Sequence, residues 1–118
     1  MDTEAIGRYA AQMMSLFEGF AEAYGTYDET QYNQTKGKLE IRSTAKTVRQ
    51  PITVELWQKH LNGDAPLGVI PIRDNDTCLW GCIDIDQYGL THEDIVKRLQ
   101  KEELPLIVCR SKSGGVHM

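Results

Sequence analysis

The chain has 118 residues, 41% of them hydrophobic and 25% charged, with a formal net charge of −4. These values suit one small globular module spanning residues 1–118, and the acidic balance is unlike that of a general nucleic-acid coat. The sequence holds no apolar run of about 18 residues, as a transmembrane helix would need. Its acidic start is unlike a signal peptide and its three cysteines are an odd number, so we expect a cytoplasmic protein.

The charge is unevenly distributed along the chain. Residues 1–35 carry one basic and six acidic side chains, whereas residues 36–60 carry six basic and two acidic ones. A basic segment in an acidic protein is a candidate nucleic-acid surface, although an ordinary solvated surface can have the same composition. The basic residues of this segment are Lys36, Lys38, Arg42, Lys46, Arg49 and Lys59.

The N-terminus carries the clearest helical signal. Apolar residues recur at i, i+3, i+4 and i+7 through residues 4–24, which predicts one helix over this range. Asp2 or Thr3 can cap its start and Gly25 can end it. The aromatic residues along this stripe are more typical of core packing than of a base-stacking platform.

Shorter elements are expected after this helix. In chain order they are a loop at 25–36, short strands or an extended hairpin at 37–42 and 46–50, a helix at 53–61, an edge strand at 67–73, a buried strand at 77–86, a helix from Thr91 to about Glu103 and a strand at 106–110. The order of the strand at 77–86, the helix from Thr91 and the strand at 106–110 predicts a right-handed parallel crossover. We therefore expect an α+β fold, a mixed β-sheet with helices packed on one side.

Two acidic residues stand two apart on the last buried strand, in the run from Leu79 to Asp86. Side chains two apart on a strand point to the same face, so Asp84 and Asp86 are predicted to project together and to share a divalent cation. Unpaired carboxylates side by side repel, and strands disfavour Asp, so a metal would explain the pair. The alternative is a solvated strand face, with Ile83 and Ile85 in the core.

A glycine-rich loop ending in histidine follows about thirty residues later. It offers backbone N–H groups that glycine is expected to leave free, two hydroxyls, cations and an imidazole, which are the donors that a phosphate chain needs. Crossover topology would bring it to the same sheet edge as the acidic pair. Metal plus triphosphate is the chemistry of nucleotidyl transfer. The alternative is a flexible Ser/Gly turn. The loop comprises Arg110, Ser111, Lys112, Ser113, Gly114, Gly115, Val116 and His117.

These motifs resemble those of the archaeo-eukaryotic primase superfamily, the primase-polymerases. Asp84-Ile85-Asp86 resembles the family's Asp-x-Asp motif, and Gly115-Val116-His117, led by Ser113-Gly114-Gly115, resembles its small-x-His motif. The run from Pro51 to Ile72 resembles the branch found in bacterial conflict systems and among CRISPR-associated primase-polymerases. The resemblance spans roughly residues 16–118.

The resemblance implies a metal-dependent DNA or RNA primase-polymerase of the kind used in replication, repair or mobile-element conflict. Asp84, Asp86 and His117 would be catalytic residues. The two acids would hold Mg²⁺ or Mn²⁺, and His117 would contact the phosphates of the incoming nucleotide. Residues 110–115 would add to the triphosphate site, and the 36–50 segment would meet a DNA or RNA template-primer. The family's third carboxylate is absent, so we expect a truncated N-terminal module that a C-terminal module or partner chain completes.

Two other functions remain open from the sequence. The first is a non-catalytic module that only binds nucleotide or nucleic acid, and the second is a sugar-nucleotide transferase, since such enzymes also use Asp-x-Asp. The cysteines are not spaced for a zinc site and are expected to be small buried hydrophobes. Trp57 and His60 are expected to pack in the fold, and His92 to be exposed.

Overall fold

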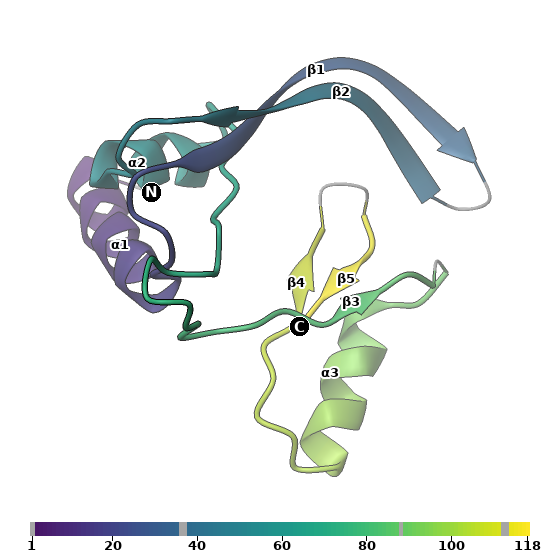
Figure 1. Ribbon diagram of the computed structural model, residues 1–118. Coiled ribbons are helices and arrows are strands. Elements are labelled where there is room, and N and C mark those ends of the chain that lie inside the picture. Colours follow the sequence, from purple (N-terminus) through teal and green to yellow (C-terminus); the bar gives the residue numbers. More distant parts are fainter. Residues whose placement is uncertain (1, 36–37, 88, 112–113) are drawn as a thin grey trace. The chain divides into compact units, whose positions relative to one another are not determined.

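The computed structural model describes residues 2–35, 38–87, 89–111 and 114–118, with the backbone alone for residues 29–43 within these ranges. The described chain contains helices and small antiparallel sheets, which confirms the expected α+β class (Figure 1). It divides into two compact units. Unit 1 comprises Met1–Asp28 and Thr44–Gly81, and unit 2 comprises Glu29–Ser43 and Cys82–Met118.

Helix α1 (Thr3–Leu16) opens unit 1. Its N-cap is Asp2, whose carboxylate accepts a hydrogen bond of 2.7 Å from the backbone N–H of Ala5. No helix in the described ranges is both long and apolar enough to cross a membrane.

The predicted extension of this helix to residue 24 is wrong. The helix ends at Leu16, and the following backbone hydrogen-bonds elsewhere in unit 1: Phe20 N–H donates to Ile70 C=O at 2.8 Å, and Ile52 N–H donates to Ala21 C=O at 2.9 Å. A side-chain carbon at Gly19 would overlap the Ile70 carbonyl, so glycine permits this close approach. Backbone pairing with distant residues thus replaces the helical hydrogen bonds after Leu16.

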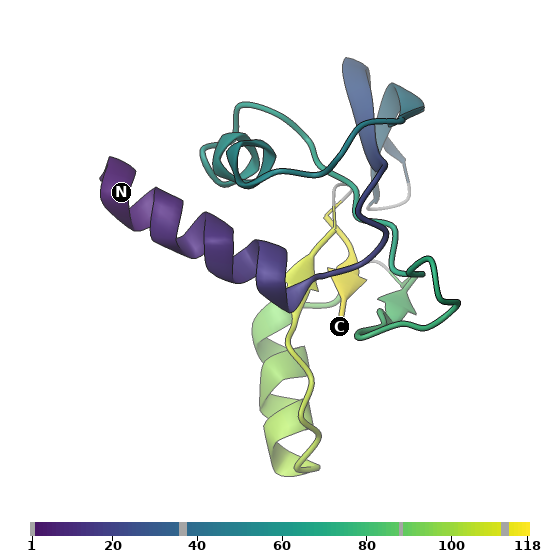
Figure 2. The same cartoon turned by 60° about the vertical axis from the view of Figure 1, so that its left-hand side comes forward.

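Helix α2 (Val54–Leu61) confirms the second predicted helix, and the Thr53 hydroxyl caps it by accepting from Leu56 N–H at 3.3 Å. It packs on α1 (Figure 2). Phe17 lies between two tryptophans, with ring centroids 6.0 Å from Trp57 and 5.2 Å from Trp80. Trp57 is 5% exposed, so this aromatic cluster forms the centre of the unit.

Strands β1 (Tyr24–Thr35) and β2 (Lys38–Val48) form the long hairpin seen in Figure 1. The expectation of a loop at 25–36 is therefore wrong for residues 25–35, where polar side chains concealed a strand. The expected strand at 67–73 is also wrong. That segment forms a single antiparallel bridge, in which Gly25 and Gly68 exchange two hydrogen bonds of 2.8 Å.

Unit 2 contains β3 (Asp84–Ile85), α3 (His92–Lys101), β4 (Cys109–Arg110) and β5 (Val116–His117). Its strand order is β3-β5-β4, and β5 pairs antiparallel with both neighbours. β3 and β4 therefore run in the same direction, as a crossover requires, but β5 lies between them. The predicted buried strand over 77–86 is reduced to two residues, and Leu79 and Ile83 are 55% and 51% exposed.

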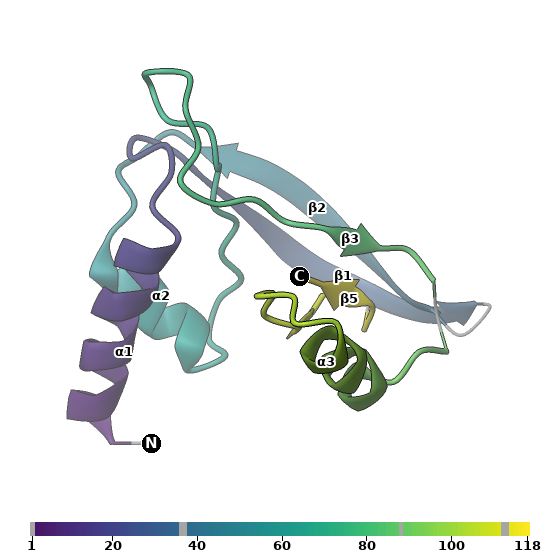
Figure 3. The ribbon, with the colours of Figure 1, turned by 90° about the horizontal axis from the view of Figure 1, so that it is seen from below.

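Helix α3 lies on one face of this small sheet, and Figure 3 looks nearly along its axis. Ile85 of β3 and Ile95 and Leu99 of α3 line a common cavity of about 610 Å³. The face of the sheet that carries Ile85 is therefore the helix side. Residues that alternate with Ile85, beginning with Asp84, point to the other face.

Candidate active site

The sequence motifs meet in one row across the three strands of unit 2. Asp84 of β3 and Cys109 of β4 are both register partners of His117 of β5. Directly opposed residues of paired strands point to the same face, so these three side chains project together. The next row, Ile85, Val116 and Arg110, points to the opposite face.

Asp84 and His117 are in contact. His117 Nε2 lies 3.3 Å from Asp84 Oδ1, and the two side chains are 44% and 68% exposed. An imidazole N–H can donate to a carboxylate at this distance. The site is thus open to solvent, and its acidic and imidazole groups already engage one another.

Asp86 follows β3 directly and is exposed. Because β3 ends at Ile85, the prediction of one long strand carrying both acids is wrong. Asp86 is two residues from Asp84 in the sequence. Its side chain shares the face of Asp84 where the backbone after Ile85 remains extended.

The loop between β4 and β5 is closed on itself. Ser111 N–H donates to Gly115 C=O at 3.1 Å, and Gly115 N–H donates in return to Ser111 Oγ at 2.9 Å. Gly114 N–H donates to Ser111 C=O at 3.0 Å, with φ of +85° at Gly114. The expectation that glycine leaves these amides free is wrong, because Ser111 accepts from both. Lys112 and Ser113 lie outside the described residues.

Residues 9–118 match the family model of the archaeo-eukaryotic primase domain of the TOTE conflict system. The chain belongs to this family. The match extends over both compact units and includes every candidate site residue, and it confirms the family resemblance found in the sequence. No curated protein and no solved structure gives a significant match.

Arg110 is separated from the other site residues of this primase domain. Its register partner is the buried Val116, so its side chain starts on the face opposite Asp84 and His117, and it is exposed. The structure therefore brings Asp84 and His117 together, but it does not bring Arg110 to them.

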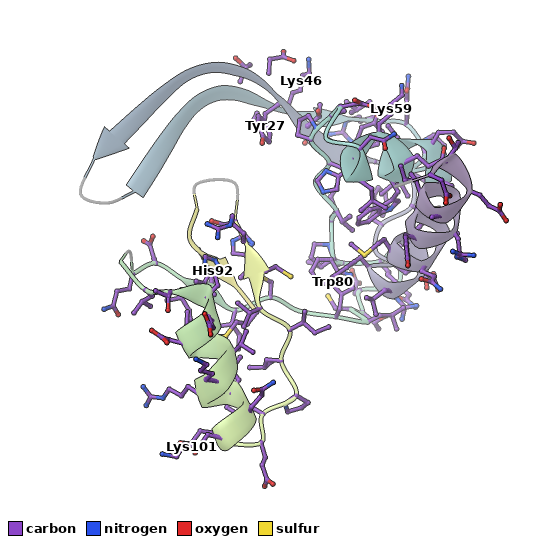
Figure 4. All side chains as sticks on the ribbon, turned by 180° about the vertical axis from the view of Figure 1, so that it is seen from behind. Tyr27, Lys46, Lys59, Trp80, His92 and Lys101 are labelled. Carbon is purple, nitrogen blue, oxygen red and sulfur yellow. The ribbon has the colours of Figure 1, made fainter. Side chains whose placement is uncertain are left out.

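One residue beside the loop was missed by sequence reasoning. His92, the first residue of α3, is half-buried rather than exposed, and its Nε2 lies 3.0 Å from the Gly115 carbonyl oxygen. Figure 4 labels His92 at the end of α3 nearest the strands and Lys101 at the other end. The cap at Thr91 predicted where the helix begins, but no sequence signal pointed to a partner 23 residues away.

The cysteine expectation is wrong for this primase domain. Cys78, Cys82 and Cys109 are all free and exposed, because the segments that carry them form edges and connections rather than a buried strand. Cys109 is aligned with His117 and Asp84 across the three strands, so its thiol lies on the same face of the sheet as these candidate site residues.

The donor chemistry of Asp84 and Asp86 fits a hard divalent cation, because Mg²⁺ and Mn²⁺ prefer carboxylate oxygens. Among the residues that the structure describes, no three His, Cys, Asp or Glu side chains are grouped closely enough to hold a metal. Mg²⁺ usually keeps several waters and binds through one or two carboxylates plus substrate phosphates. The two acids therefore suit a metal that arrives with a nucleotide.

Proposed function

We propose that this primase domain binds a nucleoside triphosphate with Mg²⁺ or Mn²⁺ for nucleotidyl transfer on a DNA or RNA template. The observation that supports this most directly is the cross-strand pairing of Asp84 and His117, whose side chains lie 3.3 Å apart on one face. A metal ligand and a phosphate donor must be neighbours if they are to hold one metal-triphosphate.

In this proposal, Asp84 and Asp86 hold the cation. When bound, the metal neutralises charge on the attacking and leaving oxygens of the phosphoryl group. His117 donates its Nε2–H to a phosphate oxygen, because a solvent-accessible imidazole N–H can serve as a hydrogen-bond donor to an anion.

In the proposed site, the hydroxyl oxygen of Ser111 occupies the acceptor position that a phosphate oxygen would take in the loop. Its Oγ accepts the Gly115 N–H at 2.9 Å, and a phosphate oxygen can replace that hydroxyl as the acceptor. Exchange of one acceptor for another leaves no buried amide unpaired, so the loop can bind an anion without first breaking its fold. Lys112 and Ser113 are assigned to the proposed triphosphate site on the basis of the sequence motif alone.

The basic segment at 36–50 is the proposed template contact. Of its cations, Lys46 lies 3.1 Å from Asp28 in a solvent-exposed ion pair within unit 1. Exposed pairs of this kind contribute little and exchange readily with phosphate. A further carboxylate from a C-terminal module or a partner chain belongs to the same proposal.

The test is nucleotide binding to the 118-residue protein by calorimetry, with and without Mn²⁺. We expect weak dNTP binding that depends on Mn²⁺ and is lost in Asp84→Ala, and no primer extension by this chain alone. Equal binding without metal, or in Asp84→Ala, would contradict the proposal. Stronger binding of UDP-sugars than of dNTPs would favour a sugar-nucleotide transferase.

Extension assays separate catalysis from binding alone. Robust extension that Asp84→Ala abolishes would establish catalysis and overturn the expectation that this chain needs completion. Binding without extension, even after a C-terminal module is supplied, would identify a non-catalytic nucleotide-binding module.

A further inference from the structure

We infer that His92 is the positioning residue of the triphosphate loop: its imidazole holds the Gly115 carbonyl, and through it sets His117 opposite Asp84. The nucleotide-binding part of this inference rests on the proposed function. The structural part stands on contacts within unit 2 alone.

The first step is the placement of His92 itself. Thr91 caps α3, with its hydroxyl accepting from Asp94 N–H at 3.3 Å, and His92 occupies the first position of the helix. A capped helix start is a rigid platform for a side chain, unlike a position on a loop.

The second step is the contact with the loop. His92 Nε2 lies 3.0 Å from the Gly115 carbonyl oxygen, and a carbonyl oxygen can only accept. The bond therefore requires the tautomer or charge state in which Nε2 carries a hydrogen. The same carbonyl also accepts from Ser111 N–H at 3.1 Å, so both of its lone pairs have donors.

The third step runs from Gly115 to the site. Gly115 and Val116 are both buried, and Val116 is only 1% exposed, so a displacement of the Gly115 carbonyl is transmitted along the packed chain rather than absorbed locally. His117 comes next, and its side chain meets Asp84. Loss of the His92 bond would free one lone pair of the Gly115 carbonyl at the point where the chain enters β5.

Two variants at position 92 separate positioning from packing. Gln places an amide N–H close to where histidine has Nε2, whereas Leu fills similar space without a donor. We expect His92→Leu to weaken binding of Mn²⁺–dATP by roughly three- to tenfold, the range that the net contribution of one hydrogen bond gives. We expect His92→Gln to stay within roughly twofold of the wild type.

His60 offers a matched control in unit 1. Its Nδ1 lies 3.3 Å from the Ala65 carbonyl oxygen, so His60→Leu removes the same type of bond away from the loop. We expect this variant to bind the nucleotide as the wild type does.

Nuclear magnetic resonance without nucleotide supplies an independent readout. In the wild type, the imidazole spectrum of His92 should show hydrogen on Nε2. His92→Leu should shift the amide signals of Gly115 and His117 and weaken the His117–Asp84 contact, while His92→Gln should not. If the wild type fails to bind Mn²⁺–dATP, the proposed function fails, and these signals still decide the role of His92.

Three results would overturn the inference. One is unchanged loop signals in folded His92→Leu, and another is unchanged nucleotide affinity in that variant when the wild type binds. The third is a loss in His92→Gln equal to that in His92→Leu, which would show that the ring shape, and not the donor, is what matters.

Discussion

Asp84 and His117 are cross-strand neighbours whose Oδ1 and Nε2 atoms lie 3.3 Å apart on the face of the unit 2 sheet opposite α3. Exposed pairs of this kind contribute at most about 1 kcal/mol to stability. A ligand can therefore separate them at small cost. The carboxylate of Asp84 and the imidazole of His117 bind one another. Both side chains therefore already stand where a metal-triphosphate would contact them.

A divalent cation should compete with His117 for Asp84. We expect Mg²⁺ together with a nucleotide to move the imidazole signals of His117 while leaving those of His60 in unit 1 unchanged, because only His117 contacts a proposed metal ligand. Two-dimensional imidazole spectra during a Mg²⁺ titration measure this directly. If His117 and His60 respond alike, the cation is acting through general screening rather than at Asp84.

Neutralising Asp84 should remove metal-dependent binding without unfolding the chain. Because ligand charge sets cation affinity, Asp84→Asn should weaken Mn²⁺–nucleotide binding by roughly tenfold or more. Stability should change by less than about 1 kcal/mol, as for other exposed pairs.

Asp28→Asn is the matched control for this change. Asp28 has the same 68% side-chain exposure and also engages one cation, Lys46, but it lies in unit 1. Calorimetric titration of both variants would show a loss in Asp84→Asn only. A similar loss in both would mean that the overall charge of the chain, not the position of Asp84, governs binding.

Helix starts were predictable because capping is local chemistry. Asp2, Thr53 and Thr91 each cap a helix through a hydrogen bond to an amide three residues on, and each was recognisable in the sequence. The end of α1 was not predictable, because it is set by backbone pairing with Ile52 and Ile70, far along the chain. Periodicity alone therefore extended that helix by two turns.

The candidate site was partly predictable, by a route that proved incorrect in detail. The motifs correctly brought Asp84 and His117 together, but through an expected parallel crossover that delivers strand ends to one edge. The structure joins them by direct antiparallel pairing of β3 with β5. The contact of His92 with Gly115 depends on a tertiary hydrogen bond that sequence patterns do not encode, whereas the bond from Gly115 N–H to Ser111 Oγ is local to the loop.

Gly114 should be needed for the loop conformation. Its φ of +85° lies in the left-handed region, and an alanine there costs about 1 kcal/mol or more even though nothing lies within 4 Å of the added carbon. We expect Gly114→Ala to weaken Mn²⁺–dATP binding, measured by calorimetry, because the strained loop shifts the Gly115 amide.

Gly63→Ala is the counterpart in unit 1, with φ of +81° and equally open surroundings. It should lose similar stability in thermal melts followed by circular dichroism, yet keep its nucleotide affinity. If the two variants bind nucleotide equally well, the Gly114 conformation has no part in the site.

Gly19 should be indispensable to unit 1. A side-chain carbon there would overlap the backbone oxygen of Ile70, which cannot move without breaking its bond to Phe20 N–H. We expect Gly19→Ala to lower the free energy of unfolding by about 3 kcal/mol or more. Both tryptophans of the chain, Trp57 and Trp80, lie in unit 1, so urea unfolding followed by their fluorescence reports on this unit.

Gly81→Ala serves as the reference for that measurement. Nothing lies within 4 Å of the carbon that it would add, and its φ is not in the left-handed region. Its unfolding free energy should remain within about 0.5 kcal/mol of the wild type. A comparable loss in both variants would mean that glycine-to-alanine changes in this unit act through the unfolded chain rather than through the Ile70 contact.

Alkylation of Cys109 should block the site. Its thiol is exposed, and its register partner is His117, so the Cβ atoms of the two residues lie about 5 Å apart and an adduct would grow out on the face shared with Asp84. In the Cys78→Ser/Cys82→Ser variant, N-ethylmaleimide can react only at Cys109. We expect the labelled protein to lose most of its Mn²⁺–dATP binding, and bound Mn²⁺–dATP to slow the labelling.

The control keeps only Cys78, in a Cys82→Ser/Cys109→Ser variant, because Cys78 is also exposed but lies in unit 1. Its labelling should leave nucleotide affinity unchanged and should proceed at the same rate with and without Mn²⁺–dATP. Mass spectrometry confirms that one adduct forms in each variant, and circular dichroism confirms that both remain folded. Full nucleotide binding by the Cys109 adduct would show that the triphosphate does not lie over the row of Asp84, His117 and Cys109, and the proposed site would then be wrong.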